Sequence, residues 1–335
     1  MDNYLDKIIC GDCLELLKKL PPESVDLVIT SPPYFQQREY ENGGIGNEKT
    51  ASEYVSNLLK IFEECVRVTK PTGSIVFNLG DKYYKSSLLL VPYMFAFEVL
   101  KKENVKLVNN ITWIKQNPTP RQFRRRLVSS TEPFFHFVKS ENYYYDLDAF
   151  EVSRAKKSVP KNGENVGKKY FQMIETSELS DLEKKTARRE LEQIISEVKS
   201  KKIESFRMKI RGLHSLPFGG QEGGRKTQIL KKGFTIIRIL GNGIKKDAIT
   251  TPVETIKGLK HPAIYPEYII GELLKLLTKK DAVVLDPFMG SGTTAVACRK
   301  LDRRYIGFEI SPEYCRLAED RIRKLKYQRT LSDTL

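Results

Sequence analysis

The stretch that most constrains the fold is residues 282–309, which reads as strand, glycine loop, helix, strand and acid. Ala282–Leu285 is a short apolar run, the loop after it contains Gly290 and Gly292, and a helical segment leads to a second apolar run that ends at Glu309. In nucleotide-binding α/β folds such a loop brings backbone N–H groups to a ligand at a helix N-terminus, and the acid accepts hydrogen bonds from ribose hydroxyls. The stretch therefore predicts an α/β fold with a nucleotide-like ligand.

Two other phosphate-binding loops share part of this pattern. A P-loop has a lysine directly after its last glycine, and none follows Gly292. A dinucleotide-binding loop has a third glycine where Ala295 stands, and alanine is tolerated there. A nicotinamide cofactor is therefore disfavoured, although this position alone leaves it open.

Helices and short apolar strands also alternate in the first part of the chain. Strand-like runs at 8–10, 26–29, 74–79 and 108–114 are separated by helical stripes, the clearest of which covers 52–68. This order is typical of a doubly wound, mostly parallel sheet of the Rossmann-like kind.

The composition changes between residues 151 and 255. This segment is rich in lysine and contains a highly charged stretch over 178–206, which we expect to be one helix with a modest apolar stripe. We therefore expect residues 1–150 and 256–335 to form two halves of one α/β domain, with 151–255 as an inserted module.

Residues 30–34, Thr-Ser-Pro-Pro-Tyr, close the apolar run 26–29. Two consecutive prolines stop both strand pairing and helix formation, so we expect a stiff loop at the carboxyl end of a buried strand. Ser31 offers a hydroxyl, the prolines offer carbonyls and Tyr34 offers an aromatic face, a set that suits a flat ring with an exocyclic amine. A proline-punctuated turn with a packing tyrosine is the alternative.

Asp12 follows the first strand-like run and precedes a helical stripe. Its carboxylate can cap that helix or accept a hydrogen bond from a ligand amine, and capping alone would explain it. Cys10 and Cys13 flank it at C-x-x-C spacing, but no second cysteine pair accompanies them. We expect these to be ordinary packing cysteines and predict no metal site.

The chain is strongly basic, with a net charge of +15 from 57 Lys plus Arg against 42 Asp plus Glu. Such an excess is typical of a nucleic-acid-binding protein, although a membrane surface or plain solubility would also suit it. One cluster of cations contains Arg121, Arg124, Arg125 and Arg126. It would either contact nucleic-acid phosphates or form a solvated face of the protein.

The remaining sequence features predict a cytoplasmic protein with no membrane association. No apolar run approaches the ~20 residues of a membrane span, and the N-terminus lacks the pattern of a signal peptide. The five cysteines are an odd number scattered through the chain, which is typical of a reducing compartment.

Four motifs together resemble the DNA amino-methyltransferases of the permuted beta group, whose catalytic half precedes the cofactor half. Thr30–Tyr34 is similar to the catalytic motif of that family, and Asp286–Thr294 is similar to its S-adenosyl-methionine loop. His261–Pro266 resembles the segment beside the cofactor's methionine, and Ile9–Leu14 resembles the segment whose aspartate reaches the adenine. The resemblance covers roughly 4–150 and 255–325.

The resemblance implies a cofactor, S-adenosyl-methionine, and a role for each matched residue. The implied catalytic residues are Ser31, Pro32, Pro33 and Tyr34. The implied cofactor-binding residues are Asp12, His261, Pro262, Asp286, Pro287, Phe288, Gly290, Gly292, Thr293 and Glu309. The segment 151–255 lies where such enzymes carry their target-recognition region.

The resemblance also implies a substrate, double-stranded DNA. Family members with serine before Pro-Pro-Tyr mostly methylate the 4-amino group of cytosine, and those with aspartate or asparagine mostly methylate the 6-amino group of adenine. Ser31 therefore favours cytosine, with adenine as the alternative. The base would leave the stack, Tyr34 would hold it with its ring rather than its hydroxyl, and the amine would attack the methyl group directly.

Several points stay open at this level. A methyltransferase acting on RNA or small-molecule amines would share the cofactor loop, and a non-catalytic basic protein would share the charge. A restriction endonuclease acting separately would be the expected partner if the enzyme belongs to a restriction-modification system. The protein would act as a monomer or a homodimer.

Overall fold

The computed structural model divides the chain into two compact units, Met1–Val152 with Lys246–Leu335, and Ser153–Lys245. It describes residues 1–37, 43–102, 104–118, 124–150, 167–200, 202–217, 224–239, 245–254 and 265–332. The second unit lies within the segment for which the sequence predicts an inserted module. A recognition role for that unit stays a prediction.

The first unit is built on an eight-stranded sheet in the order β1-β12-β11-β2-β3-β7-β6-β10. Neighbouring strands are parallel except at β7, which is antiparallel to both β3 and β6. The expected mostly parallel α/β sheet is confirmed. The strands are β1 (Lys7–Cys10), β2 (Val25–Thr30), β3 (Thr69–Asn78), β6 (Lys106–Lys115), β7 (Thr131–Val138), β10 (Ala248–Thr251), β11 (Val283–Asp286) and β12 (Arg304–Glu309).

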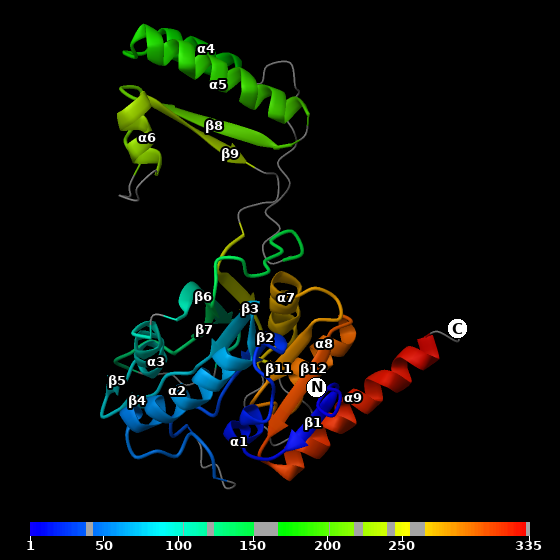
Figure 1. Cartoon of the computed structure of the whole chain (residues 1–335). Helices are drawn as coiled ribbons and strands as arrows, with labels where there is room; N and C mark the ends of the chain where they lie inside the picture. Colours follow the sequence, from blue (N-terminus) through cyan, green and yellow to red (C-terminus); the bar gives the residue numbers. More distant parts are fainter. Residues whose placement is uncertain are drawn as a thin grey trace. The chain divides into compact units, whose positions relative to one another are not determined.

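Helices cover both faces of this sheet, so its central strands are buried on both sides (Figure 1). One face packs against α1 (Cys13–Lys18), α2 (Ala51–Val68) and α3 (Val91–Leu100). The other packs against α7 (Glu267–Leu277), α8 (Thr293–Lys300) and α9 (Pro312–Ser332).

Strand β3 shows why the predicted strands read as continuous apolar runs. Ile75 and Phe77 belong to the core beneath α2 and α3, whereas Val76 between them belongs to the core beneath α7 and α8. Because successive side chains of a strand point to opposite faces, a strand covered on both faces must be apolar at every position. A short hairpin, β4 (Tyr83–Tyr84) and β5 (Ser87–Leu88), precedes α3.

The second unit has a hydrophobic core of its own. Helices α4 (Lys168–Glu175) and α5 (Asp181–Lys199) pack on one face of an antiparallel pair, β8 (Ser205–Ile210) and β9 (Phe234–Ile239), and α6 (Arg225–Lys232) precedes β9. The prediction of one helix over 178–206 was wrong at its end. The helix stops at Lys199, and the next apolar positions, which include Phe206, alternate along a strand.

No helix within the residue ranges given above is long and apolar enough to span a membrane.

Candidate active site

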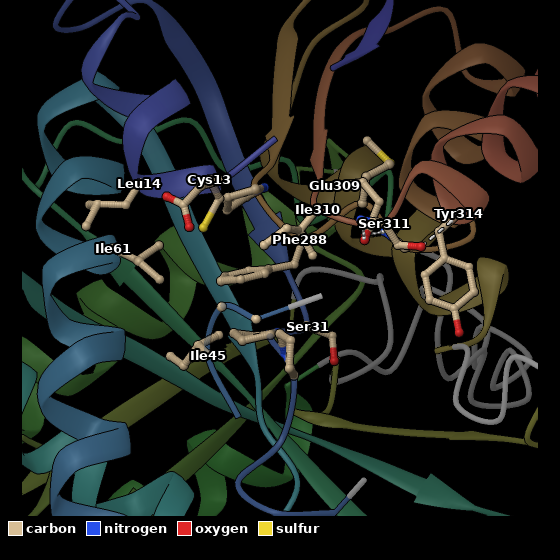
Figure 2. A pocket seen from close by; sticks show the side chains of 18 of the residues that line it. Cys13, Leu14, Ser31, Ile45, Ile61, Phe288, Glu309, Ile310, Ser311 and Tyr314 are labelled. Atoms are coloured by element: carbon tan, nitrogen blue, oxygen red, sulfur yellow. Dashed lines mark hydrogen bonds between the residues drawn. The ribbon is translucent and has the colours of Figure 1, made fainter. Parts of the chain in front are cut away.

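A cavity of ≈ 560 Å³ lies at the carboxyl ends of four neighbouring strands of the first unit (Figure 2). Its walls come from the loops after β1, β2, β11 and β12, together with part of α2. Open α/β sheets bind their ligands at this edge. The predicted site residues that line it are Asp12, Ser31, Pro32, Pro33, Tyr34, Pro287, Phe288, Gly290, Thr293 and Glu309.

Glu309 ends β12 and faces this cavity with most of its surface buried, since 9% of it is exposed. Its Oε2 accepts a hydrogen bond from the Gly290 N–H at 2.8 Å, and its Oε1 accepts one from the Ser311 N–H at 2.9 Å. Burial raises the pKa of this carboxyl above its usual range. Each carboxylate oxygen can accept a further hydrogen bond, so the group suits a ligand with two adjacent hydroxyls.

Gly290 and Gly292 have different structural roles in this loop. Gly290 has φ +54° and lines the cavity, where its N–H meets Glu309. Gly292 has φ +84° and caps α8, and a Cβ there would stand 2.7 Å from Cβ of Ala318 on α9. Gly292 is therefore required for close helix packing, and the structure does not bring it to the cavity wall.

Asp286 was also expected to contact the ligand, but it lies fully buried and does not line the cavity. Its Oδ1 accepts from the Thr30 hydroxyl at 2.6 Å and the Phe288 N–H at 3.0 Å. Its Oδ2 accepts from the hydroxyls of Tyr265 at 2.8 Å and Thr294 at 2.6 Å. These four donors use the ~four acceptor sites of a carboxylate, so Asp286 supports the site from beneath.

The Ser31 hydroxyl begins a hydrogen-bonded chain that leads from the cavity into the protein. It donates to the Tyr34 hydroxyl at 3.1 Å, which in turn lies 2.8 Å from Oδ1 of Asn78 and 3.0 Å from Oε2 of Glu132. Glu132 is ion-paired with Lys115. Because the serine proton is directed at Tyr34, the serine oxygen can accept a hydrogen bond from a ligand.

Two further contacts, one from the side chain of Tyr54 and one from the backbone of Gly80, fix the position of this loop. The Tyr54 hydroxyl of α2 donates to the Pro33 carbonyl at 2.9 Å. A Cβ at Gly80 would stand 2.4 Å from Cδ2 and Cε2 of Tyr34, so the tyrosine ring lies directly on the glycine backbone.

Asp12 serves as the helix cap that the sequence suggested and also lines the cavity. Its side chain accepts from the Glu15 N–H at 3.1 Å as the N-cap of α1.

In Figure 2 the ring of Phe288 lies between Ile310 and Ser31, which places an aromatic side chain in the middle of the site.

The family comparison agrees with this geometry. A family model described as DNA methylase, for N6 and N4 amino-methyltransferases, matches residues 25–320. The chain belongs to this family. S-adenosyl-methionine is the methyl donor of these methylases.

Two curated relatives match this methylase over most of their length. It is 28% identical over 371 residues to the Type II methyltransferase M.SfiI of Streptomyces fimbriatus, covering 91% of this chain and 88% of the relative. It is 26% identical over 346 residues to the Type II methyltransferase M.SmaI of Serratia marcescens, covering 94% and 90%.

Two solved structures share the fold of the methylase. PvuII DNA methyltransferase, described as cytosine-N4-specific, superimposes with a TM-score of 0.57 at 18% identity, covering 94% of this chain and 88% of that one. A DNA modification methylase of Thermus thermophilus, TTHA0409, in complex with S-adenosyl-L-methionine, has a TM-score of 0.52 at 20% identity, covering 94% and 92%.

The site chemistry of the methylase suits its cofactor. Glu309 has two oxygens that can accept from a diol, Gly290 lines the cavity beside it, and the Asp12 carboxylate at the cavity wall can accept from an amine. In the described parts of the methylase, no group of three or more His, Cys, Asp or Glu side chains could hold a metal ion.

Some predicted residues are not brought to this site. His261, Pro262 and Arg121 lie outside the described residues. Arg124 and Arg125 are described but do not line the cavity. The guanidinium of Arg126, which does not line it either, lies 3.7 Å from the centre of the Tyr83 ring.

Three residues of the site were not predicted from the sequence. Asn78 and Gly80 lie at and after the end of β3, which the parallel pairing with β2 brings to Tyr34. Glu132 lies on β7, which the antiparallel pairing with β3 adds to the site. A strand-end glycine after an apolar run is a hint of close backbone approach, and Gly80 could have been flagged on that ground.

Proposed function

We propose that this DNA methylase transfers a methyl group from S-adenosyl-methionine to the 4-amino group of cytosine at a specific site in double-stranded DNA. The observation that carries the proposal is Ser31. It lines the cavity directly before Pro32, its proton is directed at Tyr34, and its oxygen is available to the ligand. The family resemblance associates serine at this position with cytosine and aspartate or asparagine with adenine.

The proposed chemistry follows from the weakness of an aromatic amine as a nucleophile. Its lone pair is delocalised into the ring, so a site that accepts hydrogen bonds from both amine hydrogens favours a pyramidal nitrogen with an available lone pair. Ser31 and the Pro32 carbonyl are the proposed acceptors. Holding the amine in line with the donor methyl group would supply much of the rate.

The cofactor, when bound, supplies the electrophilic methyl group. We assign Glu309 to its ribose, Asp12 to its adenine amine, and the backbone of Pro287–Gly290 with Phe288 to the wall beside it. Nothing in this scheme needs a covalent enzyme intermediate or a metal ion.

A base inside duplex DNA cannot reach a recessed cavity, so the target must leave the stack. Tyr34 is the proposed platform for the flipped base. The Gly80 backbone occupies one side of its ring, and the base would therefore lie on the opposite side.

The inserted unit, Ser153–Lys245, is the proposed target-recognition module. The chain order, with the catalytic loop before the cofactor loop, supports assignment of the protein to the permuted beta group. We expect it to act in the cytoplasm, as a monomer or homodimer, within a restriction-modification system whose endonuclease acts separately.

Sequencing the DNA of cells that express the protein, with detection of modified bases, tests the proposal. The expected result is 4-methylcytosine at one short sequence. Finding 6-methyladenine instead would support the alternative substrate, and methylation of RNA but not of DNA would refute the proposal.

Substitution of Ser31 tests the assigned chemistry. Ser31→Ala removes an acceptor that acts as charge builds up on the amine, so single-turnover methylation should slow by about ten- to a thousandfold. DNA affinity and S-adenosyl-methionine affinity should stay unchanged. A wild-type methylation rate would show that the loop is structural.

A further inference from the structure

Among the helices and strands of the second unit, acids occur only in α4 and α5. Helix α5 carries five acids beside five cations, whereas β8, β9 and α6 carry cations and no acids. The acids of α5 are Asp181, Glu183, Glu190, Glu192 and Glu197, and the cations of the other three elements are Arg207, Lys209, Arg225, Lys226, Lys231, Lys232 and Arg238.

The strand register decides which of these cations share a face. Phe206 pairs with Arg238 and Met208 pairs with Ile236, and this inner face packs on the core beneath α4 and α5. The opposite face, here called the outer face, is formed by the alternate positions Ser205, Arg207, Lys209, Thr235, Ile237 and Ile239.

The cations that point toward α5 are neutralised. Arg238 forms an ion pair with Glu197 at 2.8 Å, and Lys232 forms one with Glu190 at 2.8 Å. Past the end of β8, Arg211 binds Glu183 at 2.9 Å. These ion pairs hold the strands against α5 and neutralise the positive charge on that side of the strands.

The cations of the outer face are not neutralised. Within the portion of the second unit that the structure describes, Arg207 and Lys209 have neither an ion-pair partner nor a hydrogen-bonded side chain. Arg207 is exposed and Lys209 is partly exposed. Ile237, opposite Arg207, is also partly exposed and does not belong to the core of the unit.

Helix α6 extends this surface. The Thr235 hydroxyl on the outer face donates to Oε1 of Gln228 at 2.6 Å, which holds α6 against that side. Three exposed cations lie on this helix, and they are Arg225, Lys226 and Lys231. Together with Arg207 and Lys209 they form what we call the basic surface.

We propose that the basic surface of the second unit docks on duplex DNA, with the outer face of β8 and β9 in the major groove. This inference rests on the proposed function and names the part of the recognition module that meets the substrate. The major groove admits a two-stranded β-ribbon. Residues two apart on an antiparallel strand are about 6.8 Å apart, which matches roughly two base-pair steps of ~3.4 Å.

Duplex DNA suits this surface better than a lipid bilayer does. A bilayer-binding surface combines cations with large apolar side chains that enter the membrane, whereas the open part of this face presents Ile237 and Ile239 between polar positions. Arginine with an adjacent apolar side chain is a pattern that suits base edges and thymine methyl groups.

The test measures binding of the full chain to a fluorescein-labelled random-sequence duplex over a series of salt concentrations. The test variant is Arg207→Gln/Lys209→Gln. The matched control is Lys185→Gln/Arg189→Gln, which also removes one lysine and one arginine, both exposed, from α5. Each phosphate contact contributes ~0.9 to the slope of log affinity against log salt. The test variant should lower that slope by about 1–2 and weaken binding at least about tenfold, and the control should change neither.

The outcomes separate this inference from the proposed function. Equal effects of the two variants would show that only net charge matters, and wild-type binding by the test variant would exclude the surface; either result overturns the inference. Loss of binding to phosphatidylserine vesicles with unchanged DNA binding would overturn it as well. Modified bases in the DNA of expressing cells report on the proposed function independently of these measurements.

Discussion

The Tyr34 hydroxyl has one proton and two acceptors within reach, Asn78 and Glu132. The sequence suggested that only the tyrosine ring matters, and these contacts change that expectation. Tyr34→Phe would leave the buried Asn78, the partly buried Glu132 and the Ser31 hydroxyl without their shared partner. We expect the free energy of unfolding to fall by about 1–3 kcal/mol, because unsatisfied buried polar groups cost that much. Chemical denaturation measures this change.

A matched control is Tyr93→Phe, which removes a hydroxyl from a half-exposed ring that packs edge-on against Phe135. It should leave the free energy of unfolding within about 0.5 kcal/mol of the wild type, as for most surface changes. If both variants unfold alike, the hydroxyl of Tyr34 has no structural role and the original expectation stands.

Burial raises the pKa of Glu309, and this shift has a consequence for cofactor affinity. In the proposed assignment the ionised carboxylate accepts hydrogen bonds from the ribose hydroxyls, so cofactor affinity should be complete above the raised pKa and fall as the pH drops through it. The loss should begin at a higher pH than for an ordinary glutamate with a pKa of 4.5. Calorimetric titration with S-adenosyl-methionine across acidic pH measures it.

Glu309→Gln serves as the control for this titration. It should bind the cofactor about 1.5–3 kcal/mol more weakly near neutral pH, since a charge-assisted acceptor is lost, and the acid-dependent step should disappear. An acid step of the same size in the variant would assign it to another carboxylate.

At the scale of the elements, the approach of α8 to α9 depends on Gly292. Gly292→Ala places a side chain at φ +84° and brings its Cβ to 2.7 Å from Ala318. Gly43→Ala is the matched control, because Gly43 has φ +76° but nothing within 4 Å of the new Cβ. Both variants bear the left-handed cost of about 1–2 kcal/mol, and only Gly292→Ala should lose clearly more in urea unfolding. Equal losses would show that the helices adjust without cost.

The sequence predicted most elements of the first unit because their signals are local. Apolar runs bounded by glycine and proline correspond to strands such as β2 and β11, and helical spacing with a capping box marks α2. The end of the charged helix was misread because Ile203 and Phe206 fit a helical stripe as well as the start of a strand. Only packing against the unit's core decides between these two.

The sequence predicted those parts of the candidate site whose residues all lie in one short motif. The loops around Ser31 and Gly290 reach the same cavity, as their motifs imply. Asp286 faces inward because three hydroxyls, from Thr30, Tyr265 and Thr294, converge on it. Thr294 lies in the same motif as Asp286, but Thr30 and Tyr265 come from other segments of the chain, and such convergence cannot be read from one motif.

At the scale of the whole molecule, we expect that the second unit can be deleted without unfolding the first. The three hydrophobic clusters each belong to one unit, so neither core depends on side chains of the other. The deletion should cover 156–245 and spare β10, which pairs with β6 in the main sheet. Replacing this segment by a flexible linker should abolish site-specific methylation and leave S-adenosyl-methionine binding measurable by calorimetry. A folded deletion variant that methylates the same sites would place recognition elsewhere, for example in the cluster around Arg125.

The four hydrogen bonds on Asp286 have a consequence for exchanging parts between related enzymes. Thr30 directly precedes the catalytic loop, and Asp286 directly precedes the cofactor loop, so one carboxylate sets the distance between the loops. A chimera that joins the N-terminal half of one relative to the C-terminal half of another would inherit Thr30 from one parent and Asp286, Tyr265 and Thr294 from the other. Such halves would be interchangeable only between parents whose side chains at these positions can form the same hydrogen bonds, however similar their motifs are.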